Sequence, residues 1–264
     1  MNKFSPEQIW DHWRKQALTH RQEIAASWSD RYAVELEIKE VLARLSDGDD
    51  VLDVGCANGF STVRYAELKR VRVRGIDYIP EMIAEAKARA AREHDHLLGQ
   101  VEFDVDNILS LRESSGRYDK VVAVRVLINL SDLARQVIAL KECARVLRDG
   151  GLLLLSEATL QGWHRLNALR AEWGLAPIPT PAFNEYLDEE RIVKAGSPEL
   201  EIIEILNFTS TYFVGTRLLK PLLAKALNTA MDVANPEHEW NRWFAMLPAW
   251  GDYGTQKMFV FRKR

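Results

Sequence analysis

Asp53, Gly55, Ala57 and Gly59 are the residues in this sequence whose types and spacing best suit ligand binding. They lie in residues 50–61, DVLDVGCANGFS, where strand-forming residues give way to glycines and then to a helical pattern. Glycine permits backbone angles and close ligand approach that a side chain would prevent. Amides at the start of the helix favour a negative or strongly polar group, and the Asp53 carboxylate could meet a cationic one. The stretch therefore predicts a strand, a ligand-binding loop and a helix.

Two other interpretations of this stretch are an ordinary strand-to-helix turn and a dinucleotide site. Short glycine patterns recur by chance, but a dinucleotide site requires G-x-G-x-x-G, whereas this loop reads G-x-A-x-G with an acid two residues before its first glycine. The loop resembles motif I of the class I S-adenosylmethionine-dependent methyltransferases, an acid followed by G-x-G-x-G. It departs from that motif at Ala57, and alanine is the smallest replacement for glycine.

The resemblance implies a fold and a cofactor. The fold is α/β, a doubly wound, Rossmann-like and mostly parallel seven-stranded sheet with one antiparallel strand near the C-terminus and helical cap insertions. The cofactor is S-adenosyl-L-methionine, which becomes S-adenosyl-L-homocysteine after methyl transfer. The resemblance places the amino acid portion of the cofactor against the loop, at Asp53, Gly55, Cys56, Ala57 and Gly59.

Asp77 follows a second predicted strand, residues 71–76, and precedes a helix that starts at Pro80. A carboxylate at the tip of this strand can accept hydrogen bonds from both hydroxyls of a ribose. The alternative is an exposed loop aspartate or a helix cap. In the resemblance Asp77 matches the motif II acid, and Tyr78 or Ile79 lies against the adenine.

Asp106, Asn107 and Ile108 follow a third predicted strand, residues 101–105. The family usually has an acid before an aliphatic residue here, and together they grip the adenine. Aligned on Ile108, the place of the acid falls to Asn107, whose amide oxygen can still accept a hydrogen bond from an exocyclic amine. Asp106 is the other candidate.

Arg125 and Asn129 follow a fourth predicted strand, residues 118–124, at the end where open α/β sheets bind ligands. They either face the cofactor or acceptor, or are solvated or capping groups. Arg125 could anchor an anionic acceptor. A hydroxyl acceptor would benefit from a general base, for which His12 and His164 are candidates, although a lone histidine is more often structural.

We expect one methyltransferase domain over residues 1–264. Residues 1–47 would form an N-terminal helical cap, with helices at 6–18 and 31–45, the second carrying Glu37 on its polar side. Residues 48–160 would form the cofactor-binding core, in which a helix from Leu133 ends at Asp149-Gly150-Gly151 before a strand at 152–155. Residues 161–200 and 210–252 would be cap insertions over the acceptor pocket, including a helix over 217–234 interrupted at Pro221. Strands are expected at 201–209 and 256–261.

All eight tryptophans lie outside residues 50–157, in the predicted caps. They could line a desolvated pocket for a small acceptor, because such pockets are largely apolar and aromatic. Equally, the caps could use them to pack a small core of their own.

The amino-acid composition of the chain restricts which ligands and binding partners we expect. The formal net charge of −3 and the pI of about 6.1 give no global attraction to nucleic acid or anionic lipid, so we expect a small-molecule acceptor. The two cysteines have no spacing typical of a zinc site, and we expect no metal. Without an apolar signal core or a run of roughly 20 apolar residues, a soluble cytoplasmic protein is expected.

The sequence thus supports three functional hypotheses. The first is in-line transfer of the sulfonium methyl group to a small-molecule acceptor, on a hydroxyl oxygen. The second is methylation of nitrogen in a metabolite, a protein or RNA, which would require an extended basic or aromatic surface. The third is a protein that binds S-adenosylmethionine without transferring its methyl group.

Overall fold

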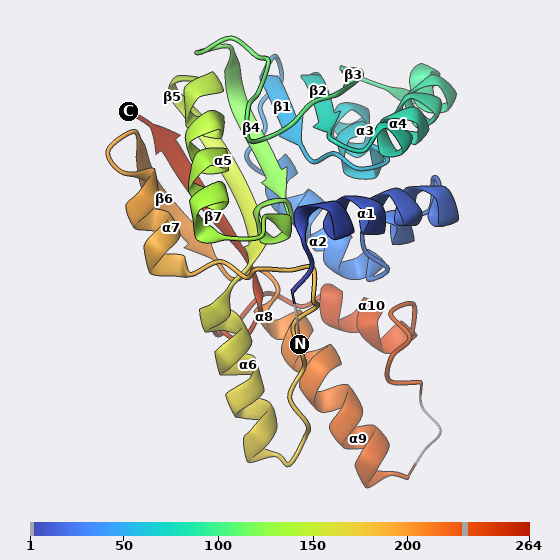
Figure 1. The fold of residues 1–264 in the computed structure, drawn as a ribbon. Coiled ribbons are helices and arrows are strands. Elements are labelled where there is room, and N and C mark those ends of the chain that lie inside the picture. The colour runs from blue at the N-terminus through green and yellow to red at the C-terminus, as the bar shows by residue number, and fades with distance from the viewer. Residues whose placement is uncertain (1–2, 229–231) are drawn as a thin grey trace.

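The computed structural model describes residues 3–228 and 232–264, and a seven-stranded sheet runs through its centre (Figure 1). The strands are β1 (Asp50–Val54), β2 (Arg72–Asp77), β3 (Gln100–Val105), β4 (Tyr118–Val124), β5 (Leu147–Ala158), β6 (Leu200–Leu206) and β7 (Gln256–Lys263). Their order is β3-β2-β1-β4-β5-β7-β6, with β7 antiparallel to both neighbours and the other pairs parallel. The predicted mostly parallel sheet with one antiparallel strand is confirmed.

Helices cover both faces of the sheet. They are α1 (Pro6–His20), α2 (Arg31–Leu42), α3 (Phe60–Leu68), α4 (Pro80–Glu93), α5 (Leu133–Val146), α6 (Leu160–Glu172), α7 (Glu189–Gly196), α8 (Ser210–Phe213), α9 (Lys220–Ala226) and α10 (Glu239–Ala245). Apolar residues of α5 and α7 pack on one face, and those of α2 and α3 pack on the other. The helices thus bury both faces of the central strands β1, β4 and β5, most of whose residues are buried.

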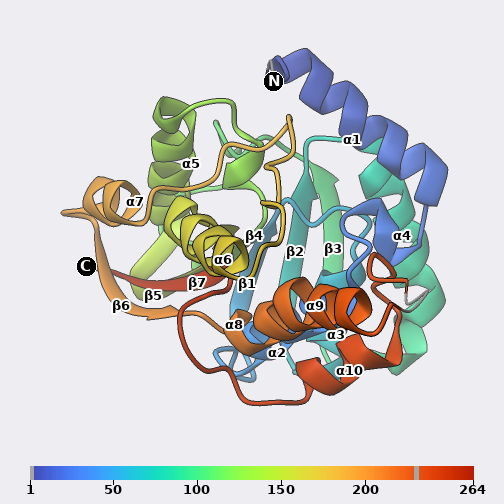
Figure 2. The same ribbon diagram turned by 90° about the horizontal axis from the view of Figure 1, so that it is seen from below.

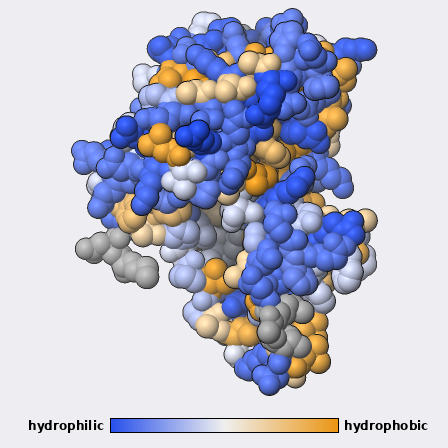
Figure 3. All heavy atoms as spheres, turned by 90° about the vertical axis from the view of Figure 1, so that its right-hand side faces the viewer, coloured by the Kyte–Doolittle hydropathy of each residue, from blue (hydrophilic) through white to orange (hydrophobic). Residues whose placement is uncertain are grey.

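The carboxyl ends of the parallel strands point towards α1 and a lobe formed by α6, α8, α9 and α10 (Figures 1 and 2). Ser5 fixes the start of α1 with a capping box in which its side chain and that of Gln8 each accept a backbone N–H. On the face shown in Figure 3, the largely hydrophilic surface is hollowed between the body of the sheet and the helices α9 and α10 below it. The ligand-binding edge of the sheet is therefore covered by elements from both ends of the chain.

Three predicted elements differ in detail. The helix expected to reach Leu45 ends at Leu42. The Asp149-Gly150-Gly151 segment, expected to end a helix, lies inside β5, because the pairing steps from Tyr118 with Leu147 to Lys120 with Leu152 and the bulge absorbs the extra residues. The predicted 217–234 helix is a π-helical turn, Val214–Leu219, followed by α9, and its residues 229–231 lie outside the described part of the chain.

No helix in the described ranges combines the length and apolar content that crossing a bilayer requires.

Candidate functional site

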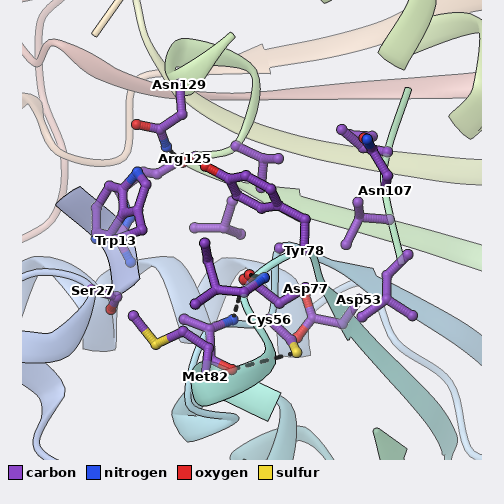
Figure 4. A pocket seen from close by; sticks show the side chains of 18 of the residues that line it. Trp13, Ser27, Asp53, Cys56, Asp77, Tyr78, Met82, Asn107, Arg125 and Asn129 are labelled. Atoms are coloured by element: carbon purple, nitrogen blue, oxygen red, sulfur yellow. Dashed lines mark hydrogen bonds between the residues drawn. The ribbon is translucent and has the colours of Figure 1, made fainter. Parts of the chain in front are cut away.

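A cavity lies at the carboxyl ends of β1, β2, β3 and β4, with residues of α1 on its opposite side (Figure 4). Of the residues predicted to contact a cofactor, those lining it are Asp53, Gly55, Cys56, Ala57, Asp77, Tyr78, Ile79, Asp106, Asn107, Ile108 and Arg125. Gly59, His12 and His164 are not among the lining residues. The structure thus gathers side chains from four strand ends, which the sequence had predicted separately.

The loop after β1 uses left-handed backbone at three positions, Gly55 (φ 70°), Ala57 (φ 48°) and Gly59 (φ 72°). A Cβ on Gly55 would lie 2.3 Å from Val126 Cγ2, so a side chain there would displace the turn after β4. Gly59 allows the Phe103 ring to pack closely against the loop, because a Cβ on it would lie 2.9 Å from that ring. Within this loop, Ala57 is the one residue with a side chain in a conformation that favours glycine.

Replacing Ala57 with glycine is expected to leave the free energy of unfolding unchanged or raise it by up to about 1 kcal/mol, because relief of left-handed strain outweighs the added freedom of the unfolded chain. Replacing Gly59 with alanine is expected to lower it by about 1–3 kcal/mol, because strain and overpacking add. Urea denaturation measures both. A clear destabilisation by Ala57→Gly would contradict this account of the loop.

Asp53 is a buried carboxylate with no cation beside it. Its side chain is 4% exposed and accepts a 2.5 Å hydrogen bond from Thr62 Oγ1. Burial, opposed by that hydrogen bond and reinforced by the nearby Asp77, raises the pKa of Asp53 to about 7. Across residues 3–228 and 232–264, Asp53 forms no ion pair with lysine, arginine or histidine. A bound cation would stabilise its charged form.

Asp77 ties the loop to the end of β2. Its Oδ2 accepts a hydrogen bond from the Ala57 N–H at 3.1 Å, and its Oδ1 accepts one from the Ile79 N–H at 2.9 Å. Burial raises the pKa of Asp77 to about 6 despite these bonds. Each carboxylate oxygen retains a lone pair that can accept a further hydrogen bond from a ligand hydroxyl.

Asp106 and Asn107 are held differently from each other. The Asp106 carboxylate accepts a hydrogen bond from the Arg112 N–H at 3.1 Å and lies 3.3 Å from Arg112 Nε. Asn107 is exposed, and its Oδ1 accepts a hydrogen bond from the Leu109 N–H at 3.0 Å. Asp106 is therefore compensated by a cation, whereas the Asn107 amide keeps its N–H donors and a lone pair for a ligand.

Arg125 lines the cavity but its charge is already paired. It has a left-handed backbone (φ 56°), its Nε lies 3.2 Å from Glu37 Oε2, and its guanidinium lies 4.8 Å from the centre of the Trp28 ring. Glu37, expected on the polar side of its helix, is 1% exposed and also accepts hydrogen bonds from Ser156 and Gln256. This pairing leaves Arg125 poorly suited to anchor an anionic acceptor by itself.

Comparison with known proteins identifies the family. A family model described as a methyltransferase domain matches residues 45–178, which span β1 to β5 and the cavity. The chain belongs to the class I S-adenosylmethionine-dependent methyltransferases. The sequence resemblance at Asp53 to Gly59 and at Asp77 is confirmed at the level of the family.

This methyltransferase is 32% identical to O-methyltransferase resE of Aspergillus sclerotiorum over 177 residues, 66% of this chain and 64% of that protein. The match thus spans slightly less than two thirds of that relative. Among solved structures, the [4+2]-cyclase SpnF has a TM-score of 0.64 at 18% identity, covering 100% of this chain and 98% of SpnF. Magnesium protoporphyrin IX methyltransferase of Synechocystis PCC 6803, solved with S-adenosylhomocysteine, has a TM-score of 0.60 at 18% identity, covering 97% and 94%. Both structures share the fold.

The cavity of this methyltransferase fits the cofactor of its family. S-adenosylmethionine carries two cationic groups, a ribose diol and an adenine. Asp53 offers a buried carboxylate that forms no ion pair within the described residues, Asp77 offers free lone pairs, and Gly55 lines the cavity between them. Within the described residues, no group of three or more histidine, cysteine or acidic side chains is placed to hold a metal ion.

Glu157 shapes the methyltransferase cavity without lining it. It is fully buried, and its Oε1 accepts hydrogen bonds from the N–H groups of Val126 at 2.8 Å and Leu127 at 2.6 Å. Burial raises its pKa to about 8. Glu157 therefore holds the turn after β4, which carries Arg125 and Asn129.

Trp13 is a cavity residue that sequence reasoning did not single out. It is the one tryptophan of the eight among the lining residues, and its indole Nε1 is buried without a hydrogen-bond partner in the described structure. Figure 4 places it beside Asn129 and at the opposite end of the cavity from Asn107. A buried donor of this kind is normally paired, and a small shift of the indole would bring it into contact with a ligand in the cavity. Its position on an amphipathic helix was the available signal, but Trp10 shares that helix.

The two candidate histidines lie away from the cavity lining. His12 stacks on Phe183 with ring centres 4.3 Å apart, and burial, with Lys15 nearby, lowers its pKa. His164 is exposed on α6, where its ring lies 4.8 Å from that of Trp163. The stacked His12 thus links α1 to the segment before α7.

Proposed function

We propose that this chain transfers the methyl group of S-adenosylmethionine to a hydroxyl oxygen of a small-molecule acceptor. The observation that carries the proposal is the pair of buried carboxylates, Asp53 and Asp77, which lie at adjacent strand ends in one cavity and form no ion pair within the described residues. Family membership and the O-methyltransferase relative support the same reaction.

In this proposal the cofactor lies along the strand ends. Asp53 faces its ammonium group, and the loop from Gly55 to Gly59 surrounds its amino acid portion. Asp77 accepts hydrogen bonds from the ribose, with Tyr78, Ile79, Asn107 and Ile108 around the adenine. Helix α1 and the lobe of α6, α8, α9 and α10 form the cap, and the end of the cavity with Trp13 and Asn129 receives the acceptor (Figure 4).

The sulfonium group of the cofactor supplies an electrophilic methyl group. The protein must hold the acceptor oxygen in line with it and exclude water. Its α1 side, with Pro6, Ile9 and Trp13, gives an apolar wall for that purpose. The lining residues include no histidine or lysine. The acceptor hydroxyl should therefore be an acidic one, such as a phenol, which ionises without a strong protein base.

Calorimetric titration with S-adenosylmethionine and S-adenosylhomocysteine, with NAD as a control, tests cofactor binding. Micromolar binding of both sulfur compounds and none of NAD is expected. The transfer step is then tested by mass spectrometry with phenols, aliphatic alcohols and amines. Methylation confined to amines would contradict the assignment to oxygen.

A second candidate is a protein that binds the cofactor without transferring its methyl group. The absence of a histidine or lysine from the cavity lining favours it, and the fold is shared with the [4+2]-cyclase SpnF. Formation of S-adenosylhomocysteine separates the two. Tight cofactor binding without any S-adenosylhomocysteine from a broad panel of nucleophiles would favour the second candidate.

Replacing Trp13 with phenylalanine is expected to raise the acceptor KM by about 5- to 20-fold, because it removes a buried hydrogen-bond donor worth roughly 1–2 kcal/mol. The ring and the apolar wall remain, so cofactor affinity should change less than threefold. Steady-state kinetics and calorimetry measure the two quantities. Trp10→Phe, on the same helix and outside the cavity lining, is the control. A loss of cofactor affinity with unchanged KM would place the indole against the cofactor instead.

A further inference from the structure

A second cavity, of about 310 Å³, lies between α6, residues 28–30 and two stretches near the C-terminal end, residues 216–221 and 233–236. Its lining residues are Trp28, Ser29, Asp30, Arg170, Ile178, Thr216, Arg217, Pro221, Val233, Ala234 and Pro236. Two of them are arginines and one is an acid, and several others are apolar. The cavity therefore combines an apolar wall with an excess of positive charge.

Asp30 cannot neutralise this excess, because it is fully engaged. It is 2% exposed, its Oδ2 forms an ion pair with Arg217, and its Oδ1 accepts hydrogen bonds from Tyr212 Oη at 2.5 Å and the Ala33 N–H at 3.3 Å. The negative charge of Asp30 is therefore paired with Arg217. The charge of Arg170 is left uncompensated.

Arg170 has only backbone carbonyls as partners within the described residues. Its Nε and Nη2 donate to the Ala176 carbonyl at 3.0 and 2.7 Å, and its Nη1 donates to the carbonyl of Arg217. Burial and the neighbouring Arg217 lower its pKa. Two of its five N–H donors remain free, as do donors of Arg217. An anion between the two guanidinium groups would relieve their repulsion and use these donors.

The two cavities are neighbours. Ser27 lines the cofactor cavity and the adjacent Trp28 lines the second one. Arg125, which lines the cofactor cavity, stacks over the Trp28 ring. This stacked pair of side chains therefore lies between the cofactor cavity and the cationic cavity. An elongated molecule that passes the stacked pair could occupy both cavities.

We propose that the second cavity binds the anionic group, a carboxylate or a phosphate ester, of an amphipathic methyl acceptor. Arg170 and Arg217 bind the anion, Trp28 and Ile178 pack against the apolar body, and the hydroxyl end reaches the cofactor cavity. This inference rests on the proposed function, which assigns the first cavity to the cofactor, and it names the class of acceptor.

Anion binding is tested first, by calorimetry on the chain saturated with S-adenosylhomocysteine, so that the cofactor cavity is filled. The probes are 3-phenylpropanoate, its neutral amide and phenyl phosphate. The carboxylate or the phosphate should bind about 10- to 100-fold more tightly than the amide, the range expected for charge-assisted hydrogen bonds. The tighter of the two identifies the anionic group. Equal affinities for all three probes, or no binding of either anion, would overturn the proposal.

Arg170→Gln should reduce the preference for the anion to less than about threefold, and Arg170→Lys should retain part of it. The matched control is Arg165→Gln on the same helix, because Arg165 is exposed, pairs with Asp252 and lies outside the cavity. It should leave the preference unchanged. A preference that survives in folded Arg170→Gln would overturn the site, and the wild-type comparison of probes remains decisive if that variant does not fold.

The link to the acceptor is tested with phenols that carry either a carboxylate or its methyl ester. Free acids should be the better acceptors, and Arg170→Gln should raise their KM at least tenfold without changing kcat or cofactor affinity. Methylation of acids and esters with equal KM would overturn the acceptor role. Failure of the proposed function looks different, because S-adenosylhomocysteine would then form from no acceptor, or only from amines.

Discussion

Asp77→Asn is expected to weaken binding of S-adenosylmethionine by about 10- to 100-fold, the loss typical of a charge-assisted hydrogen bond. The amide keeps one acceptor oxygen for the Ala57 or Ile79 N–H but loses the charge that favours both ribose hydroxyls. Because burial raises the pKa of Asp77 to about 6, neutralising it removes a desolvation cost, and the free energy of unfolding should fall by no more than about 1 kcal/mol. Calorimetry and urea denaturation measure the two effects.

Asp106→Asn is the matched control. Asp106 also lines the cavity, but its carboxylate is paired with Arg112. Its substitution should change cofactor affinity less than threefold. If Asp106→Asn were the more damaging of the two, the assignment of the ribose to Asp77 would be wrong and the adenine or ribose would lie nearer to β3.

Cofactor binding is expected to release a proton near pH 7, because a cation beside Asp53 lowers a pKa that burial has raised to about 7. Affinity should rise about tenfold between pH 6 and pH 8 from this group. Calorimetry in phosphate and in Tris, whose ionisation heats differ, measures the released proton. Asp53→Asn should lose this release and this part of the pH dependence, while titration of the cofactor amine remains common to both proteins.

The same carboxylate affects stability with a defined sign. The folded-state pKa lies above the ordinary value of 3.8, so the folded chain binds the proton more tightly than the unfolded chain. The stabilisation from Asp53 is complete below about pH 4 and is lost as the pH rises through about 7. At pH 8, Asp53→Asn should therefore be more stable than the parent chain by roughly 1–3 kcal/mol. Equal stability of the two proteins at pH 5 and at pH 8 would show that folding does not raise the pKa of Asp53.

The sheet and its acid-tipped strands were predictable because their signals are local. A short apolar run, an acid and a glycine or proline define β1 and β2 within a few residues, and the structure places both strands as predicted. The prediction that Asp149-Gly150-Gly151 ends a helix also relied on a local signal, and it was wrong. A glycine pair is typical of a helix end, whereas the bulge that keeps it within β5 depends on pairing with β4.

The charge pairing around the cavity was not predictable, because its partners are distant in sequence. Glu37 has the spacing of a solvent-facing helix residue, yet it is buried against Arg125, Ser156 and Gln256 from other elements. The same applies to the tryptophans. Trp13 and Trp28 line the two cavities, whereas Trp163, Trp240 and Trp243 are absent from both linings. The tryptophans were expected either to line an acceptor pocket or to pack a core within the caps, and neither expectation describes all eight.

The two uncompensated acids of the cofactor cavity also have a consequence for the lifetime of the protein. At neutral pH the chain without cofactor holds Asp53 and Asp77 buried side by side at a cost that a bound cation removes. A ligand that binds only the folded state stabilises it by mass action. The rate of proteolysis should therefore fall as S-adenosylmethionine or S-adenosylhomocysteine is added, and a cell that runs short of the cofactor would degrade this protein sooner. Limited proteolysis at pH 7.5 with and without S-adenosylhomocysteine would reveal this coupling, and equal rates would exclude it.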